Sequence, residues 1–149
     1  MLDEDYLRHR IAQVGYLGAK LEEAGAAILR PVGGHAVYLN AGRMLPAIPA
    51  EHFPAQALTC AMYLVGGVRG VEIGSVMAGR DPLTGENRVA PLELVRLAVP
   101  RRLYSSRQLE QAADAAAEVL AGADAVRGLE MTSEAPVLRH FTARFRPVG

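Results

Sequence analysis

Apolar residues recur at helical spacing in three stretches of the chain. In residues 4–24 they return every three or four positions, and acidic residues occupy the first turn. Gly25 then provides a stop signal. A second helix is predicted to begin near Pro54 and to end at the glycine pair 66–67. A third is predicted over residues 105–122, where a capping box opens the helix.

Short apolar runs between turn signals predict the strands. They cover residues 26–29, 35–39, 68–73, 94–99, 129–132 and 137–145. The last two are expected to form a closing hairpin. This order of elements predicts an α+β fold, with a mainly antiparallel sheet and helices on one of its faces.

Arg96 stands out because it interrupts the apolar run 94–99. On a strand it shares a face with Leu94 and Ala98, and neither face of the run reads as exposed. A guanidinium stays protonated, so in such a place it requires an anion or carbonyl partners. The pattern leaves three interpretations open: a hook for a ligand carboxylate or phosphate, an internal ion pair, or an edge-strand arginine reaching water.

Composition narrows the functional classes. The 149 residues fit one domain, and a net charge of zero gives no electrostatic reason to expect binding to nucleic acid or an anionic membrane. No apolar stretch is long enough to span a bilayer, and the four scattered histidines show no metal-ligand spacing. Cys60 is the single cysteine, which fits a reducing cytoplasm, and its apolar neighbours suggest a core position.

Two histidines lie on predicted strands together with Arg96. His35 opens the strand that follows a glycine pair, and His140 lies within the last predicted strand. Each alone is typical of a structural histidine. If the strands share a sheet, however, the three polar groups could meet at one cleft.

Seven segments, taken in order, resemble the C-terminal part of the pyridoxal-phosphate β-eliminating lyases, the family of tryptophanase and tyrosine phenol-lyase. They are residues 10–18, 31–37, 53–57, 70–75, 79–85, 95–101 and 137–145. The resemblance implies the small C-terminal domain of a fold-type I enzyme, with residues 1–25 as a linker helix and 26–149 as an α+β sandwich. It also implies that Arg96 binds the α-carboxylate of an amino-acid substrate.

Within this family the resemblance favours the tryptophanase branch. Tyrosine phenol-lyases carry an arginine where this chain has Ile73, and two phenylalanines where it has His140 and Phe141. An isoleucine wall suits an indole or another apolar leaving group. His140 is then expected near the leaving group, Phe141 as an aromatic wall, and His35 on the cleft side.

The large domain that binds the cofactor in this family has no counterpart in these residues. Lys20 is the one lysine, and it matches a variable position of the linker helix. The resemblance therefore implies a small subunit that is inactive alone. It implies no catalytic residue, no cofactor-binding residue and no metal ligand in this chain, and a separate chain that binds most of the pyridoxal phosphate. We expect a cytoplasmic hetero-oligomer acting on a tryptophan-like amino acid. A non-catalytic amino-acid-binding or regulatory module, and an inactive fragment, remain the alternatives.

Overall fold

The structure is a computed structural model that describes residues 3–101 and 103–149. Its long helices are α1 (Glu4–Glu23), α3 (Pro54–Gly66) and α5 (Ser106–Ala121). One-turn helices are α2 (Ala41–Met44), α4 (Ser75–Ala78) and α6 (Arg139–Thr142), and 3-10 turns cover Ala50–His52 and Ala123–Ala125. The strands are β1 (Ala36–Asn40), β2 (Val71–Ile73), β3 (Leu94–Ala98), β4 (Leu129–Ser133) and β5 (Arg144–Pro147). The α+β class predicted from the sequence is confirmed.

The three long helices begin and end close to their predicted positions because their termini carry recognisable caps. The Tyr6 backbone N–H donates to the Asp3 carboxylate at 3.0 Å, which starts α1. Gly25 follows that helix with a φ of +82°, a conformation that glycine adopts without strain. At α5, the Ser105 N–H donates to Oε1 of Gln108 at 2.9 Å, as the capping box predicts. Residues 1–2 of the predicted linker helix lie outside the described residues.

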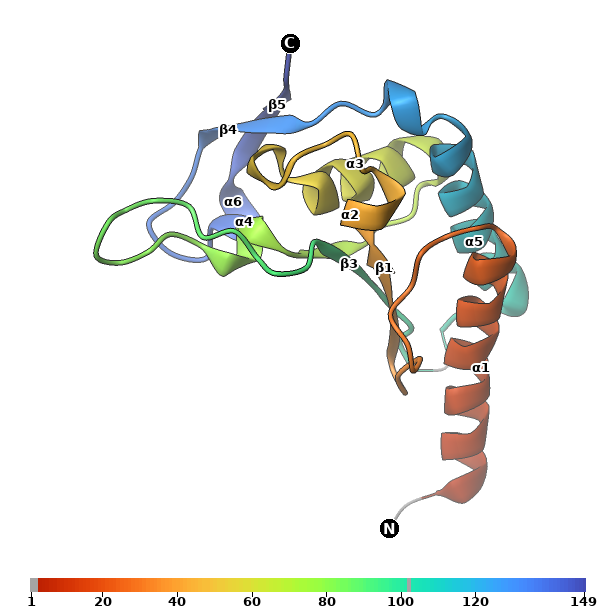
Figure 1. The fold of residues 1–149 in the computed structure, drawn as a ribbon. Helices are drawn as coiled ribbons and strands as arrows, with labels where there is room; N and C mark the ends of the chain where they lie inside the picture. The colour runs from red at the N-terminus through yellow and green to blue at the C-terminus, as the bar shows by residue number, and fades with distance from the viewer. Residues whose placement is uncertain (1–2, 102) are drawn as a thin grey trace.

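Two small antiparallel sheets organise the remainder of the chain. The first has the strand order β1-β3-β2, so β3 is central and pairs on both sides. The second consists of β4 and β5 alone. In Figure 1 the N-terminal half of α1 extends away from the body of the domain, and the loop after α4 projects from the opposite side.

The hydrophobic core fills the space between one face of the three-stranded sheet and the helices. Val95 and Leu97 of β3 point into it, and both are almost fully buried. Helices α3 and α5 approach each other very closely at Gly66, where an added Cβ would come within 2.5 Å of the Ala115 Cβ. A glycine and an alanine at this crossing allow the helices to close over the sheet.

Two of the predicted strands are wrong. Residues 26–29 form only an isolated bridge, between Ile28 and Leu39, and their apolar pattern reflects packing against the core rather than a strand ladder. The predicted strand 137–145 is divided by α6, so His140 lies on a one-turn helix and not on a strand. The chain winds there because Leu138 adopts a left-handed conformation and Arg139 binds carbonyl groups of α4.

The expectation that neither face of the Arg96 strand is exposed is also wrong. Ala98 is exposed and Arg96 is half-buried, whereas Val95 and Leu97 on the other face are buried. The helices cover only one face of the sheet, which leaves the face of Arg96 partly open. An arginine on this strand can therefore be reached by a ligand.

Candidate functional site

Arg96 lies on the central strand, between Tyr38 of β1 and Val71 of β2. Residues paired in an antiparallel sheet point to the same face, so these two side chains flank the guanidinium group. The Arg96 Nε is buried and has no hydrogen-bond partner among residues 3–101 and 103–149. Since a buried charged donor is costly to leave unpaired, this nitrogen is suited to an anion supplied from outside these residues.

Ile73 shares the open sheet face with Arg96. It pairs with Leu94, while Val71, two residues earlier on β2, pairs with Arg96. Ile73 is therefore a diagonal neighbour of the guanidinium group, and it is half-buried. The register brings together two of the residues that the sequence selected.

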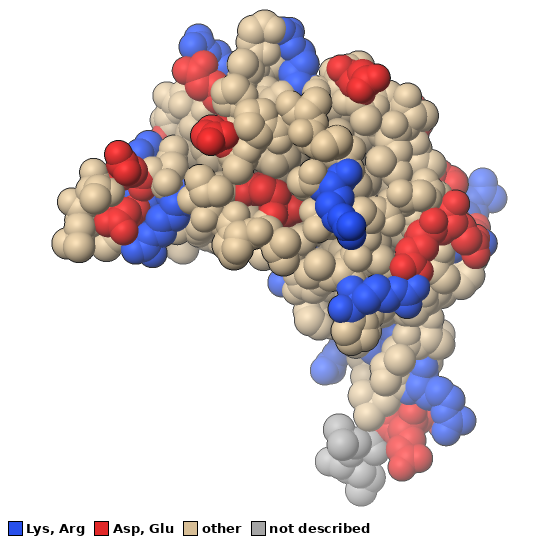
Figure 2. All heavy atoms as spheres, in the orientation of Figure 1, with Lys and Arg blue, Asp and Glu red and all other residues tan. Residues whose placement is uncertain are grey.

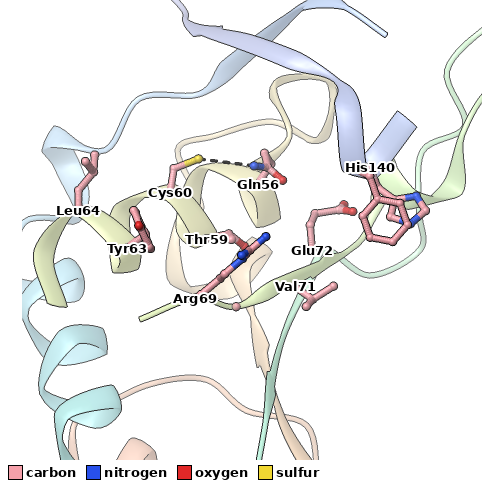
Figure 3. A pocket seen from close by; sticks show the side chains of 11 residues that line it. Gln56, Thr59, Cys60, Tyr63, Leu64, Arg69, Val71, Glu72 and His140 are labelled. Carbon is pink, nitrogen blue, oxygen red and sulfur yellow. Dashed lines mark hydrogen bonds between the residues drawn. The ribbon is translucent and has the colours of Figure 1, made fainter. Parts of the chain in front are cut away.

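A cleft of about 540 Å³ opens between α3, β2 and α6. His140 comes to it from α6, and Val71 and Glu72 come from β2 (Figure 3). Phe141, the next residue of α6, also lines the cleft. The side of α3 that faces the cleft contributes Gln56, Thr59, Cys60, Tyr63 and Leu64. Val71 connects the two parts of the site, because it lines this cleft and is also the strand partner of Arg96.

The two rings of α6 are close but differently exposed. The His140 and Phe141 ring centroids are 4.1 Å apart at an interplanar angle of 45°. His140 is half-buried, whereas Phe141 is 77% exposed. Phe141 thus presents an aromatic face at the mouth of the cleft, where it can contact a flat apolar group.

Glu72 was not selected from the sequence, although it is the buried acid of the cleft. It is 5% exposed, and its carboxylate accepts hydrogen bonds from the N–H groups of Val76 and Met77 at 3.1 and 2.9 Å. Burial raises the pKa of Glu72 to about 7; those two N–H groups oppose the rise, and the nearby charge of Glu93 adds to it. The sequence does contain a signal that could have identified Glu72, because it is an acidic residue between two apolar residues of a predicted strand.

Glu93 is the second buried acid, and it meets Glu72 at Gly74. Glu93 accepts hydrogen bonds from the backbone N–H and the hydroxyl of Ser75. A Cβ placed on Gly74 would come within 2.5 Å of Glu93 Oε2 and 2.7 Å of Glu72 Oε1. Both carboxylates therefore border the same backbone position, and any side chain larger than that of glycine would force at least one of them to move.

His35 and Lys20 lie apart from these residues. His35 precedes β1 and is exposed, and β1 is on the opposite side of β3 from β2 and the cleft. The Lys20 ammonium group is 2.6 Å from the Glu23 carboxylate, whose hydrogen bond and charge raise the pKa of the lysine. The Lys20 amine is therefore protonated and paired with Glu23. Cys60, predicted as a core residue, is half-buried at the cleft, where Gln56 Nε2 donates to its sulfur at 3.5 Å.

The single lysine is paired on α1, and within residues 3–101 and 103–149 no three His, Cys, Asp or Glu side chains are grouped to hold a metal ion. No helix in the same ranges is long and apolar enough to cross a membrane. On the face shown in Figure 2, acidic and basic side chains are interspersed.

Comparison with known proteins identifies relatives of this sequence. Tyrosine phenol-lyase of Symbiobacterium sp. is 52% identical over 149 residues, which is 100% of this chain and 32% of the relative. Tyrosine phenol-lyase of Pasteurella multocida is 51% identical over 98% of the chain and 32% of that protein. Tryptophanase of Salinibacter ruber is 49% identical over 99% of the chain and 31% of the relative. Identity over the whole chain thus does not separate the two enzymes.

The chain spans about a third of the length of the curated relatives it matches. The family model described as beta-eliminating lyase matches residues 1–115. This match covers more than half of the chain and includes β2 and β3, the strands of Ile73 and Arg96. The chain belongs to the beta-eliminating lyase family.

Proposed function

We propose that this chain supplies the substrate-binding side of a pyridoxal-phosphate-dependent β-eliminating lyase that acts on a tryptophan-like amino acid. The supporting observation is Arg96, whose buried Nε lacks a partner among the described residues on the open face of a central strand. An amino-acid carboxylate offers two coplanar oxygens that match the fork of a guanidinium group. Arg96 binds this carboxylate and so orients the amino acid toward the cleft.

The leaving group of the amino-acid substrate points toward the cleft between α3, β2 and α6. Phe141 provides apolar surface in the cleft for an indole ring, and His140 provides a polar edge beside it. Ile73 adds apolar surface on the sheet face that it shares with Arg96. An arginine at position 73 would place a charge there that an indole cannot satisfy. This choice of side chains supports the tryptophanase-like assignment.

The cofactor is bound mainly by a separate large-domain chain, with which this chain forms a cytoplasmic hetero-oligomer. When bound, pyridoxal phosphate would supply an electron sink for the chemistry at the substrate α-carbon. The residues of this chain bind and orient the amino acid. We assign no cofactor role to Lys20, whose ammonium group pairs with Glu23 on α1.

Reconstitution tests this proposal. The chain is co-expressed with a polypeptide that corresponds to the other two thirds of the relatives' length. We expect the two to co-purify, to show cofactor absorbance, and to release indole from tryptophan. Arg96→Gln should then reduce kcat/KM by roughly 10- to 150-fold, because charge-assisted hydrogen bonds contribute about 1.5–3 kcal/mol. Arg144→Gln, a change at an exposed position of β5, is the matched control.

Three results would overturn the assignment. A stable complex that binds the cofactor and releases no product from tryptophan or tyrosine contradicts a lyase function. Tight binding of an amino acid by the isolated chain, abolished by Arg96→Gln, would instead favour a binding or regulatory module. Association with no partner and binding of no amino acid would favour an inactive fragment.

A further inference from the structure

Arg139 is a buried arginine whose hydrogen bonds are complete. It is 5% exposed, and each of its five N–H groups has an acceptor. Nε donates to the Val76 carbonyl at 2.8 Å, and Nη2 donates to the carbonyls of Ser75 and Gly79 at 2.7 and 3.0 Å. Nη1 donates to Asn87 Oδ1 at 2.6 Å and to Glu134 Oε2 at 2.9 Å.

These acceptors belong to three separate parts of the chain: α4, the projecting loop after it, and the segment after β4. The carbonyls of Ser75 and Val76 belong to a four-residue helix, in which the last carbonyls have no partner within the helix. Arg139 therefore completes the end of α4. Burial opposes the ionisation of Glu134, but its hydrogen bonds and ion pairs with Arg139 and Arg80 outweigh this and lower its pKa.

The residue before Arg139 is strained. Leu138 has φ 53° and ψ 38°, a left-handed conformation that costs a non-glycine residue about 1–2 kcal/mol. Its side chain is 64% exposed, so packing does not stabilise this conformation. Such strain persists only where surrounding contacts determine the backbone, and here the contacts belong to Arg139.

A one-turn helix is not stable by itself, because nucleation is unfavourable. Helix α6 has only four residues, yet it carries both His140 and Phe141. His140 also lines a second cleft, of about 530 Å³, between α6 and the loop after α4. His140 thus borders two cavities, and a small rotation of α6 would change the shape of both.

We propose that Arg139 is a positioning residue that holds His140 and Phe141 against the leaving-group side of the cleft, with Leu138 as the strained turn that aims them. This inference rests on the proposed function, since it assigns the two aromatic rings to substrate recognition. Arg139 itself is buried behind α6 and does not contact the substrate. It acts through the backbone of α6.

The first test requires no lyase activity. The chain is isotope-labelled at histidine, and NMR spectra of the Arg139→Lys variant are compared with those of the unchanged chain. Arg146→Lys, which changes an exposed residue of β5, is the control. Lysine keeps the charge but has three donors, so at least two contacts are lost. We expect the His140 signal, assigned with His140→Ala, to shift and broaden, while those of His9, His35 and His52 stay unchanged. An unshifted His140 signal in folded Arg139→Lys would overturn the proposal.

A milder variant covers the case in which Arg139→Lys fails to fold. Asn87→Ala removes one acceptor and should broaden the His140 signal to a smaller extent. Leu138→Gly removes the strain and should leave the His140 signal in place as long as Arg139 is intact. Loss of the signal in Leu138→Gly alone, or no change in Asn87→Ala, would contradict the role of Arg139.

The second test uses the reconstituted complex. Arg139→Lys should lower kcat/KM for tryptophan at least tenfold, whereas the inhibition constant of alanine, which has the carboxylate but no leaving group, should change less than twofold. If Arg139 had only a structural role, kcat/KM for tryptophan and the binding of alanine would weaken to the same extent. If the complex has no activity at all, the proposed function fails, but the NMR result still decides whether Arg139 positions α6.

Discussion

Gly74→Ala should destabilise the chain through the two buried carboxylates. The new Cβ would lie within 3 Å of Glu72 Oε1 and Glu93 Oε2, so at least one carboxylate must move. Together these carboxylates accept four hydrogen bonds from the turn and α4. If two are lost at about 1.5 kcal/mol each, the free energy of unfolding falls by about 3 kcal/mol. For a domain of this size that corresponds to a decrease in Tm of roughly 6–12 °C.

Urea and thermal unfolding followed by circular dichroism measure the effect. Gly15→Ala is the matched control: Gly15 lies exposed within α1, and an added Cβ meets no atom within 4 Å. It should raise stability by about 0.5–1 kcal/mol, because alanine favours the helix. A change of stability in the same direction in both variants would contradict the role of the two carboxylates. So would a Glu93→Ala background in which Gly74→Ala costs as much stability as before, since neighbouring sites must couple.

Three further predictions follow from the same packing and charges. The folded-state pKa of Glu72, about 7, exceeds the ordinary value of 4.5, so between these pH values the folded chain binds more protons than the unfolded chain. The free energy of unfolding should therefore fall as pH rises from about 4.5 to 7. In urea titrations at several pH values Glu72→Gln should flatten this dependence, and an unchanged slope would contradict the raised pKa of Glu72. Gly66→Ala should destabilise by about 1–3 kcal/mol through contact with Ala115, and Ala115→Gly should restore part of this loss in a double-variant unfolding assay. Ile73→Arg in the reconstituted enzyme should lower the ratio of kcat/KM for tryptophan to that for tyrosine, and a ratio that rises or stays constant would remove Ile73 from leaving-group recognition.

Local sequence signals predicted the elements whose termini are encoded in a few neighbouring residues. Asp3 and Gly25 mark the two ends of α1, and the capping box of Ser105 and Gln108 marks the start of α5. The positions of these helix ends could therefore be predicted without tertiary information. The same signals failed at residues 137–145. There Arg139 winds an apolar run into α6. In four of its five hydrogen bonds the acceptor lies more than fifty residues earlier in the chain.

The candidate site shows the same division. Arg96 could be selected because a cation inside an apolar strand is unusual, and the register then placed Ile73 beside it. Glu72 and Glu93 escaped selection because their burial depends on the turn at Gly74 and on the approach of α3. His35 was selected from its local setting, which contains no information on the order β1-β3-β2 that separates it from the cleft.

The strand order gives the two halves of the site different mechanical properties. Arg96 is on the central strand, which is hydrogen-bonded along both edges, whereas the cleft wall is the three-residue strand β2, bonded within the sheet only to β3. Local opening therefore occurs more readily at β2 than at β3. Under the proposed function, a substitution on β2 can reshape the pocket for a different leaving group without moving Arg96, the proposed carboxylate anchor. Such an arrangement would let one scaffold change its substrate by small steps while every intermediate still held an amino acid in the same place.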